Sequence, residues 1–390
     1  MTHVTHAISV PRTMRIGGGS VARAGEVLND LGARRPLVVT DAFLVSTGQV
    51  DKLVASLEGA GASAAVYSDT VPDPTTDSLA PAKAALAAHR ADSVVGFGGG
   101  SPMDTAKALA VLGVNDKPMR EFKAPNLYNG PALPIVAIPT TAGSGSEATQ
   151  FTVITDSATD EKMLCIGTSF LPIAAIIDYR LTMSMPARLT ADTGIDALTH
   201  AVEAYVSRKA NAFSDGLCLL AIRAIGQNIR RVVADGSDEQ ARAAMMIAAT
   251  QAGMAFSNSS VALIHGMSRP IGAHFHVAHG LSNAMLFPAV TRYSIDGALD
   301  RYADCARAMG MAGEHDPSTA AAAKFVEGIS ELCRDLAVPT PQRYGISRGD
   351  WDRLIPTMAE QALASGSPAN NPLVPDADAI AAIYDEVYAG

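Results

Sequence analysis

The sequence of 390 residues lacks several features that would assign it to common functional classes. Lys and Arg number 30 against 39 Asp and Glu, so the formal net charge of −9 leaves no basic footprint for nucleic acid. No apolar run reaches the roughly 18 residues of a membrane-spanning helix, and the N-terminus does not resemble a secretory signal. The 4 cysteines lie far apart without a CxxC pair, which argues against a disulfide scaffold and against a thiolate metal site. We therefore expect a cytoplasmic globular protein that binds neither nucleic acid nor membrane.

The chain is long enough for two domains, and its pattern changes near Pro186. Before that residue, short apolar runs alternate with helical patterns, which predicts parallel β-α-β units. The expected strands fall within residues 34–42, 61–69, 91–100, 132–143, 150–156, 162–167 and 173–178. After it, nearly every segment has the helical period. We predict an α/β domain with a Rossmann-like parallel sheet over residues 1–185 and an all-helical domain over residues 186–390.

A glycine-rich turn, VVGFGGGSPMDTAK, places Gly98, Gly99, Gly100 and Ser101 after an expected strand and before a helix. Glycines let backbone N–H groups approach a phosphate, and the helix N-terminus adds partial positive charge. The turn is not a G-x-G-x-x-G motif, because Ser101 stands where the third glycine would be. The alternative is a plain tight turn, with Asp104 and Lys107 of the same stretch forming a surface ion pair.

Two further loops could contact a nucleotide. Asp41 ends the strand LVVTD, where a carboxylate would bind the adenosine ribose and favour NAD over NADP. The alternative is that Asp41 only caps the next helix. The loop PTTAGSGSE (139–147) also follows an expected strand and suits the polar edge of a ligand.

Histidines are concentrated in DALTH (196–200) and HGMSRPIGAHFHVAH (265–279). Asp196 and His200 lie four residues apart on an expected helix, so both can reach one ion. We expect His265 near the end of another helix, which Pro270 should stop, and His279 beside a turn permitted by Gly280.

One carboxylate with several imidazoles and no thiolate suits Fe(II) or Zn(II), and tolerates Mn, Co or Ni. The alternative is that the helical Asp196–His200 pair is a surface or capping pair and that His274 and His276 point into solvent. The coincidence of this acid–imidazole pair with the histidine-rich segment favours a bound catalytic metal.

Four motifs in this order resemble the iron-containing (group III) alcohol dehydrogenases over essentially the whole chain: GGGSPMDTAK, PTTAGSGSE, LTADTGIDALTHAVEAYVS and HGMSRPIGAHFHVAHGLSNA. The resemblance implies a nucleotide-binding α/β domain and a helical domain, the architecture also of dehydroquinate-synthase-like proteins. It implies NAD(P), a divalent metal and a homodimer or larger homo-oligomer. The implied metal ligands are Asp196, His200, His265 and His279. The implied cofactor contacts are Asp41, Gly98, Gly99, Gly100, Ser101, Thr140, Thr141, Lys162, Leu181 and Thr182.

The sequence departs from the family pattern at three positions. Arg269 stands where the family often has a histidine that helps to pass the proton, so His276, a ribose hydroxyl or water remain as routes. Asp73 replaces the Asn of a common PNPT motif and places a carboxylate near the cofactor. Ala278 replaces a frequent proline before the last ligand.

The expected reaction is hydride transfer between NAD and a small alcohol, with the cation acting as Lewis acid on the substrate oxygen. Arg269 would suit an anionic substrate such as a short ω-hydroxy acid and its semialdehyde. The alternative is that it pairs with Asp73, another acid or the cofactor. The rival functions are a zinc glycerol-dehydrogenase-like or dehydroquinate-synthase-like enzyme, and a non-catalytic assembly protein.

Overall fold

The computed structural model describes residues 5–389, and the chain divides into two compact units. The α/β unit comprises Ala7–Ser184, and the helical unit comprises the residues from Met185 onward, with which residues 5 and 6 are grouped. Among the described residues, no helix is both long and apolar enough to cross a membrane.

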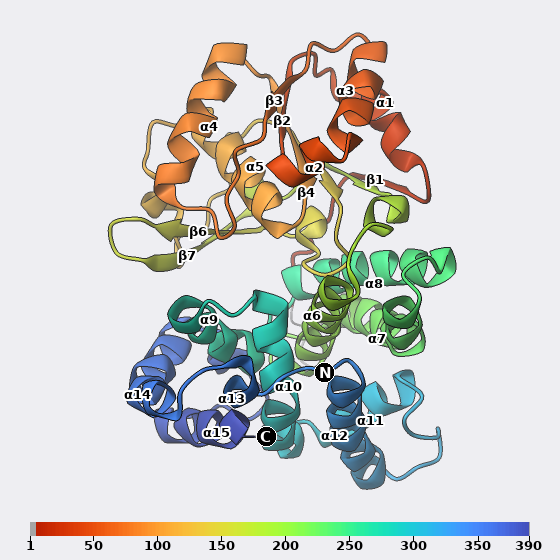
Figure 1. The fold of residues 1–390 in the computed structure, drawn as a ribbon, viewed down its shortest axis with the longest axis vertical. Coiled ribbons are helices and arrows are strands. Elements are labelled where there is room, and N and C mark those ends of the chain that lie inside the picture. The colour runs from red at the N-terminus through yellow and green to blue at the C-terminus, as the bar shows by residue number, and fades with distance from the viewer. Residues whose placement is uncertain (1–4, 390) are drawn as a thin grey trace. The chain divides into compact units, whose positions relative to one another are not determined.

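The α/β unit is built around a six-stranded parallel sheet with the strand order β1-β8-β5-β4-β2-β3 (Figure 1). Its strands are β1 (Thr13–Ile16), β2 (Pro36–Val39), β3 (Ala65–Tyr67), β4 (Ser93–Gly98), β5 (Ile135–Pro139) and β8 (Ala174–Ile177). The predicted Rossmann-like class is therefore confirmed. The predicted strands 150–156 and 162–167 form a separate antiparallel hairpin, β6 (Phe151–Asp156) and β7 (Glu161–Ile166).

Helices cover both faces of this sheet. They are α1 (Ala24–Leu31), α2 (Ala42–Ser46), α3 (Gln49–Gly59), α4 (Thr76–His89) and α5 (Gly100–Leu112). Val38 packs on one face with residues of α1 and α3, whereas Leu37 and Val39 pack on the other face with α4 and α5. This alternation follows from the two-residue period of a strand, and apolar side chains on both faces are typical of a parallel sheet.

Helices make up the second unit, as predicted. They are α6 (Ala187–Val206), α7 (Ala212–Ala234), α8 (Glu239–Ser257), α9 (Leu263–Phe275), α10 (His279–Ser294), α11 (Leu299–Ala308), α12 (Ser318–Asp335), α13 (Pro341–Tyr344), α14 (Arg348–Ala364) and α15 (Ala377–Ala389). The central helix is α6, in which every residue from Gly194 to Val206 is buried. Because α6 is enclosed by its neighbours, polar side chains on it can be brought into a common site.

Candidate functional site

Helix α6 contributes two of the predicted metal ligands, Asp196 and His200. Their four-residue separation puts both side chains on one face of the helix, and both residues are buried. Phe256 of α8 stacks on the His200 ring with 4.3 Å between ring centroids, which fixes the plane of the imidazole. The interpretation of these residues as a surface or capping pair is therefore wrong.

Helices α9 and α10 contribute His265 and His279. His265 lies in the first turn of α9, and the helix continues past Pro270 to Phe275, so the predicted helix end at Pro270 is wrong. Proline removes only one main-chain hydrogen bond, and buried apolar residues on both sides, including Met267 and Ile271, keep the helix packed.

Gly280 has a different purpose from the turn that we expected. It is the second residue of α10, immediately after His279. A Cβ atom at Gly280 would lie 2.4 Å from the carbonyl oxygen of Asp192 and 3.3 Å from Cβ of Asp196, both on α6. The glycine therefore allows α10 to approach α6 closely enough to bring His279 to Asp196.

The four side chains form one cluster whose ligand atoms all lie within 4.8 Å of one another. The distance from Asp196 Oδ1 to Nε2 is 3.9 Å for His200, 3.7 Å for His265 and 3.6 Å for His279. A tetrahedral ion with ligands about 2.1 Å away separates neighbouring donors by roughly 3.4 Å. The group fits one divalent transition metal, and the half-exposed His279 leaves one side of it accessible.

The electrostatics of the cluster also suit a cation. Burial alone would raise the pKa of Asp196, but the imidazoles of His200, His279 and His265 outweigh burial and lower it, so the carboxylate is ionised. Burial lowers the pKa of His265, and the carboxylates of Glu203 and Asp196 more than offset this and raise it.

Two residues around the ligands were not predicted from the sequence. Asn283 Nδ2 donates to Asp196 Oδ1 at 2.7 Å, and Glu203 Oε2 accepts from His265 Nδ1 at 2.6 Å. The available signal was their position: Glu203 follows His200 by three residues, and Asn283 follows His279 by four, so each shares a helix face with a ligand.

Arg269 and His276 were the predicted candidates for substrate recognition and proton transfer. Arg269 lies one turn after His265 on α9, and its Nη1 donates to Ser367 Oγ at 3.2 Å. Among the described residues of the helical unit, no carboxylate lies within ion-pair distance of its guanidinium. His276 is the left-handed residue that ends α9 (φ 54°), is exposed, and is not among the four clustered ligands.

In the α/β unit, the predicted cofactor residues follow the carboxyl ends of neighbouring strands. The chain passes from β2 outward to β3 and from β4 outward to β5, so the order reverses between β2 and β4. Asp41 follows β2 and the glycine turn follows β4, which places them at the position where open α/β sheets bind ligands. Gly98 has φ 154°, and a Cβ there would lie 2.6 Å from Pro102 Cγ, so only glycine fits.

The loop after β5 lies against this turn. Thr140 N donates to the Gly98 carbonyl at 3.0 Å, and a Cβ at Gly99 would lie 3.5 Å from the Thr141 side chain. Gly100 begins α5, and a Cβ there would lie 3.8 Å from Ser144. The two Gly/Ser-rich segments of the sequence thus lie against each other.

Lys162, Asp73 and Ser101 also come together. Lys162 Nζ pairs with Asp73 Oδ2 at 3.1 Å, and the backbone N–H of Asp73 donates to Ser101 Oγ at 3.3 Å. The carboxylate of Asp73 therefore lies beside the glycine turn, and the alternative partner that we considered for it, Arg269, belongs to the other unit.

Three other predicted cofactor residues have structural contacts of their own. Asp41 Oδ1 accepts from Leu44 N at 2.9 Å and caps α2, as the alternative interpretation held. Leu181 packs in the sheet core, and Thr182 is fully buried with its hydroxyl donating to the Tyr179 carbonyl. The Thr182 hydroxyl is thus engaged within the protein.

The alternative interpretation of Asp104 and Lys107 as a surface ion pair is wrong. Lys107 is fully buried, and its Nζ donates to the Thr149 carbonyl (3.0 Å), Thr149 Oγ1 (2.9 Å) and the Phe151 carbonyl (2.8 Å). Asp104 accepts from Ser146 Oγ at 3.3 Å. Both side chains therefore anchor the segment after β5 to α5.

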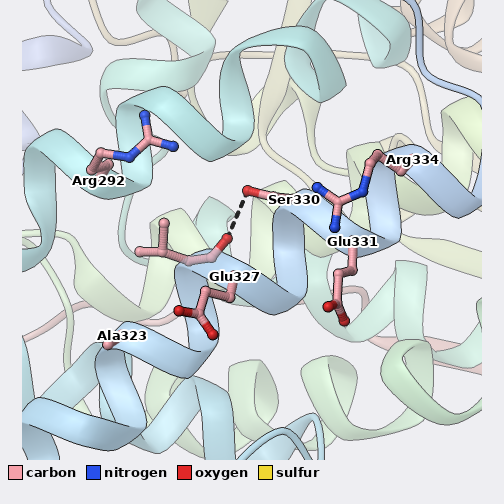
Figure 2. A pocket seen from close by; sticks show the side chains of 7 residues that line it. Arg292, Ala323, Glu327, Ser330, Glu331 and Arg334 are labelled. Atoms are coloured by element: carbon pink, nitrogen blue, oxygen red, sulfur yellow. Dashed lines mark hydrogen bonds between the residues drawn. The ribbon is translucent and has the colours of Figure 1, made fainter.

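The helical unit also has a surface hollow between α10 and α12, shown in Figure 2. Arg292 of α10 borders it, together with the α12 residues Ala323, Val326, Glu327, Ser330, Glu331 and Arg334. Arg292 pairs with Glu386, and Ser330 Oγ donates to the Val326 carbonyl at 2.8 Å. The hollow contains none of the predicted site residues.

The donor set without thiolates and the glycine turn at a strand-order reversal define the class of metal-dependent, nucleotide-dependent dehydrogenases. The chain belongs to the iron-containing alcohol dehydrogenase family. The family model "Iron-containing alcohol dehydrogenase" matches residues 11–179, and the family model "Fe-containing alcohol dehydrogenase family, C-terminal" matches residues 190–388. The resemblance seen in the four motifs is thereby confirmed, and the protein is an NAD-dependent, metal-dependent alcohol dehydrogenase.

Individual relatives differ in the substrates that their names state. The chain is 39% identical over 388 residues to long-chain-alcohol dehydrogenase 1 of Geobacillus thermodenitrificans, covering 98% of this chain and 97% of that protein. It is 34% identical over 360 residues to NAD-dependent methanol dehydrogenase of Bacillus methanolicus, covering 92% and 94%. A crystal structure of 1,3-propanediol oxidoreductase matches with a TM-score of 0.95 at 34% identity and covers 99% of this chain and 100% of that one. Family membership therefore leaves the substrate to local residues.

Proposed function

We propose that this dehydrogenase interconverts a small alcohol and its aldehyde, and that its preferred substrate carries an anionic group at the far end, as a short ω-hydroxy acid does. The observation that carries the proposal is Arg269. Arg269 lies one turn from His265, and its guanidinium donates to the neutral Ser367 hydroxyl and forms no ion pair with the part of the helical unit that the structure describes. Burial lowers the pKa of Arg269, and the nearby carboxylate of Glu203 partly offsets this effect. The pKa of a guanidinium is so far above neutral pH that the side chain stays charged. An anionic substrate would supply the missing partner.

We propose that Asp196, His200, His265 and His279 hold the metal ion. We propose that Asp41, Asp73, Gly98, Gly99, Gly100, Ser101, Thr140, Thr141, Lys162, Leu181 and Thr182 form the NAD site. When bound, the ion supplies a Lewis acid for the substrate oxygen and NAD supplies the hydride acceptor. Asp196 contributes a negative charge that favours the cation, and Arg269 orients the substrate.

We assign the movement of the hydroxyl proton to His276. Its imidazole is exposed at the end of α9, three residues before His279, so it can pass a proton to water.

Two features of the proposal rest on the family and on composition: homodimeric or larger assembly, and a cytoplasmic location. The four buried, unpaired cysteines favour such a reducing compartment.

The test compares substrates and variants in one steady-state assay of NAD reduction. Neutral alcohols and ω-hydroxy acids of equal length are assayed with the wild type, Arg269→Gln and Arg269→Lys. A hydrogen-bonded charge contributes about 1.5–3 kcal/mol, so Arg269→Gln should lower kcat/KM for the acids by roughly 10- to 150-fold.

The neutral alcohols should change by less than about threefold, and Arg269→Lys should recover part of the loss on the acids because it keeps the charge. Equal losses on both substrate classes, or a wild-type preference for the neutral alcohols, would contradict anion recognition.

A further inference from the structure

Glu203 is a buried carboxylate that none of the predicted roles uses. It lies on α6, three residues after His200, and is 3% exposed. Its neighbours in the sequence, Val202 and Ala204, are apolar and buried. A charge in such surroundings destabilises the fold unless several donors satisfy it.

Three N–H groups converge on this carboxylate. Oε2 accepts from His265 Nδ1 at 2.6 Å and from Ala262 N at 2.9 Å, and Oε1 accepts from Ile264 N at 2.5 Å. All three donors belong to the beginning of α9. One side chain of α6 therefore holds both an imidazole and the helix that carries it.

The contact with His265 determines which ring nitrogen carries the proton. An ionised carboxylate can only accept hydrogen bonds, so Nδ1 of His265 must be protonated. In the neutral ring Nε2 then carries the lone pair, and this atom lies 3.2 Å from Asn283 Nδ2 and 3.7 Å from Asp196 Oδ1. Only this form of the ring can donate electrons toward the centre of the cluster.

The contacts with the backbone replace a missing helix cap. Ala262 precedes α9 and has no side chain that could cap it. The first N–H groups of a helix need external acceptors, and a negative charge there is favourable because of the helix dipole. Glu203 supplies both, so the angle at which α9 leaves α6 is tied to the same carboxylate that orients His265.

We propose that Glu203 is a positioning residue of the metal centre, which holds His265 in the Nδ1-protonated form and holds the first turn of α9, so that Nε2 faces the ion site before an ion binds. The effect on affinity rests on the proposed metal site. The protonation form of the ring does not, because it is a property of the metal-free protein.

The experiment combines two measurements on the full-length protein. Long-range ¹H–¹⁵N spectra of histidine-labelled, metal-free protein assign the protonated nitrogen of His265, with His265→Asn identifying its signals. Competition with a chromophoric chelator gives the Kd for Zn²⁺ of the wild type and of Glu203→Gln. In the variant an amide replaces the carboxylate. Both oxygens of Glu203 accept from N–H groups, so the NH₂ group of the amide must face one of these donors and cannot accept from it.

Asn370→Ala is the matched control. Asn370 Nδ2 donates to Ser260 Oγ (2.8 Å) and the Val261 carbonyl (3.3 Å), so it steadies the same approach to α9 without contacting His265. A purely structural role of Glu203 predicts that both variants lose Zn²⁺ affinity in proportion to their loss of stability in urea.

The expected result is Nδ1-protonated His265 in the metal-free wild type and a Kd for Zn²⁺ raised 10- to 100-fold in Glu203→Gln, but less than threefold in Asn370→Ala. A ring protonated on Nε2 and not on Nδ1 in the wild type would overturn the proposal, as would equal losses of affinity in the two variants at equal loss of stability. If the wild type bound no Zn²⁺, the proposed metal site would fail, and the spectra of the wild type would still decide the role of Glu203.

Discussion

Replacing Lys107 with methionine should destabilise the α/β unit far more than the same change on a helix surface. The three N–H groups of the Lys107 ammonium donate to two carbonyls and one hydroxyl of Thr149 and Phe151, and the side chain is fully buried. Methionine has nearly the same length and leaves little cavity, so the change removes the charge and the three donors and little else.

The magnitude follows from what the lysine leaves behind. Both carbonyls lose a charged donor. Asp104 loses the cation that lowers its pKa against the effect of burial, which raises it. Removing one partner of a buried, hydrogen-bonded charge typically destabilises a protein by about 3–5 kcal/mol. Because Ser146 donates to Asp104, the loss also loosens the loop beside the glycine turn and should weaken NADH binding.

Urea unfolding followed by far-UV circular dichroism measures the free energy, and NADH fluorescence measures the Kd. Trp351 is the only tryptophan and is buried in the helical unit, so its fluorescence should shift less than the dichroism signal. Lys83→Met is the control, because Lys83 Nζ makes one hydrogen bond, to the Asn115 carbonyl at 3.1 Å. We expect it to change stability by less than about 1 kcal/mol. Equal stability of the two variants would refute the reasoning.

Three further changes test the two sites. Gly280→Ala should raise the Kd for Zn²⁺ at least tenfold, because the new Cβ would lie 2.4 Å from the Asp192 carbonyl oxygen and must push His279 away; an unchanged Kd in chelator competition would contradict this. Removing the metal ion with a chelator should lower the urea midpoint of Trp351 fluorescence in the wild type but not in Asp196→Ala. An ion at 100 times its Kd adds about 2.7 kcal/mol to the free energy of unfolding, and an equal shift in both proteins would disprove Asp196 as a metal ligand. Asp73→Asn should tighten NADH binding a few fold at low salt and less at high salt, because it frees Lys162 and removes a negative charge beside Ser101; NADH titrations at two ionic strengths would show no difference if Asp73 does not act electrostatically.

The cluster of Asp196 with three histidines could be predicted from the sequence because its signals are local. Asp196 and His200 share a helix face by spacing alone, and the histidine-rich segment is visible by inspection. The helix that carries His265 was predicted less well. Pro270 is a local stop signal, but α9 continues because its burial depends on residues distant in the sequence. Local rules fail where tertiary packing outweighs a single lost hydrogen bond.

The same limit explains why the alternative of a surface ion pair for Lys107 fails and why Glu203 was missed. Each lies in a helix whose residues are buried on every side: Thr105–Leu112 in α5 and Gly194–Val206 in α6. For α5 the sequence contained a usable sign of this, since Thr105–Leu112 is apolar on nearly every side and such a helix is an interior helix. A charged residue in such a helix cannot point into water, so it must have partners on another segment of the chain. For Lys107 these partners are carbonyls near β6, and for Glu203 they are the N–H groups that begin α9. A charged residue in a helix that is buried on every side therefore predicts a specific buried contact, although only the folded structure identifies the partner.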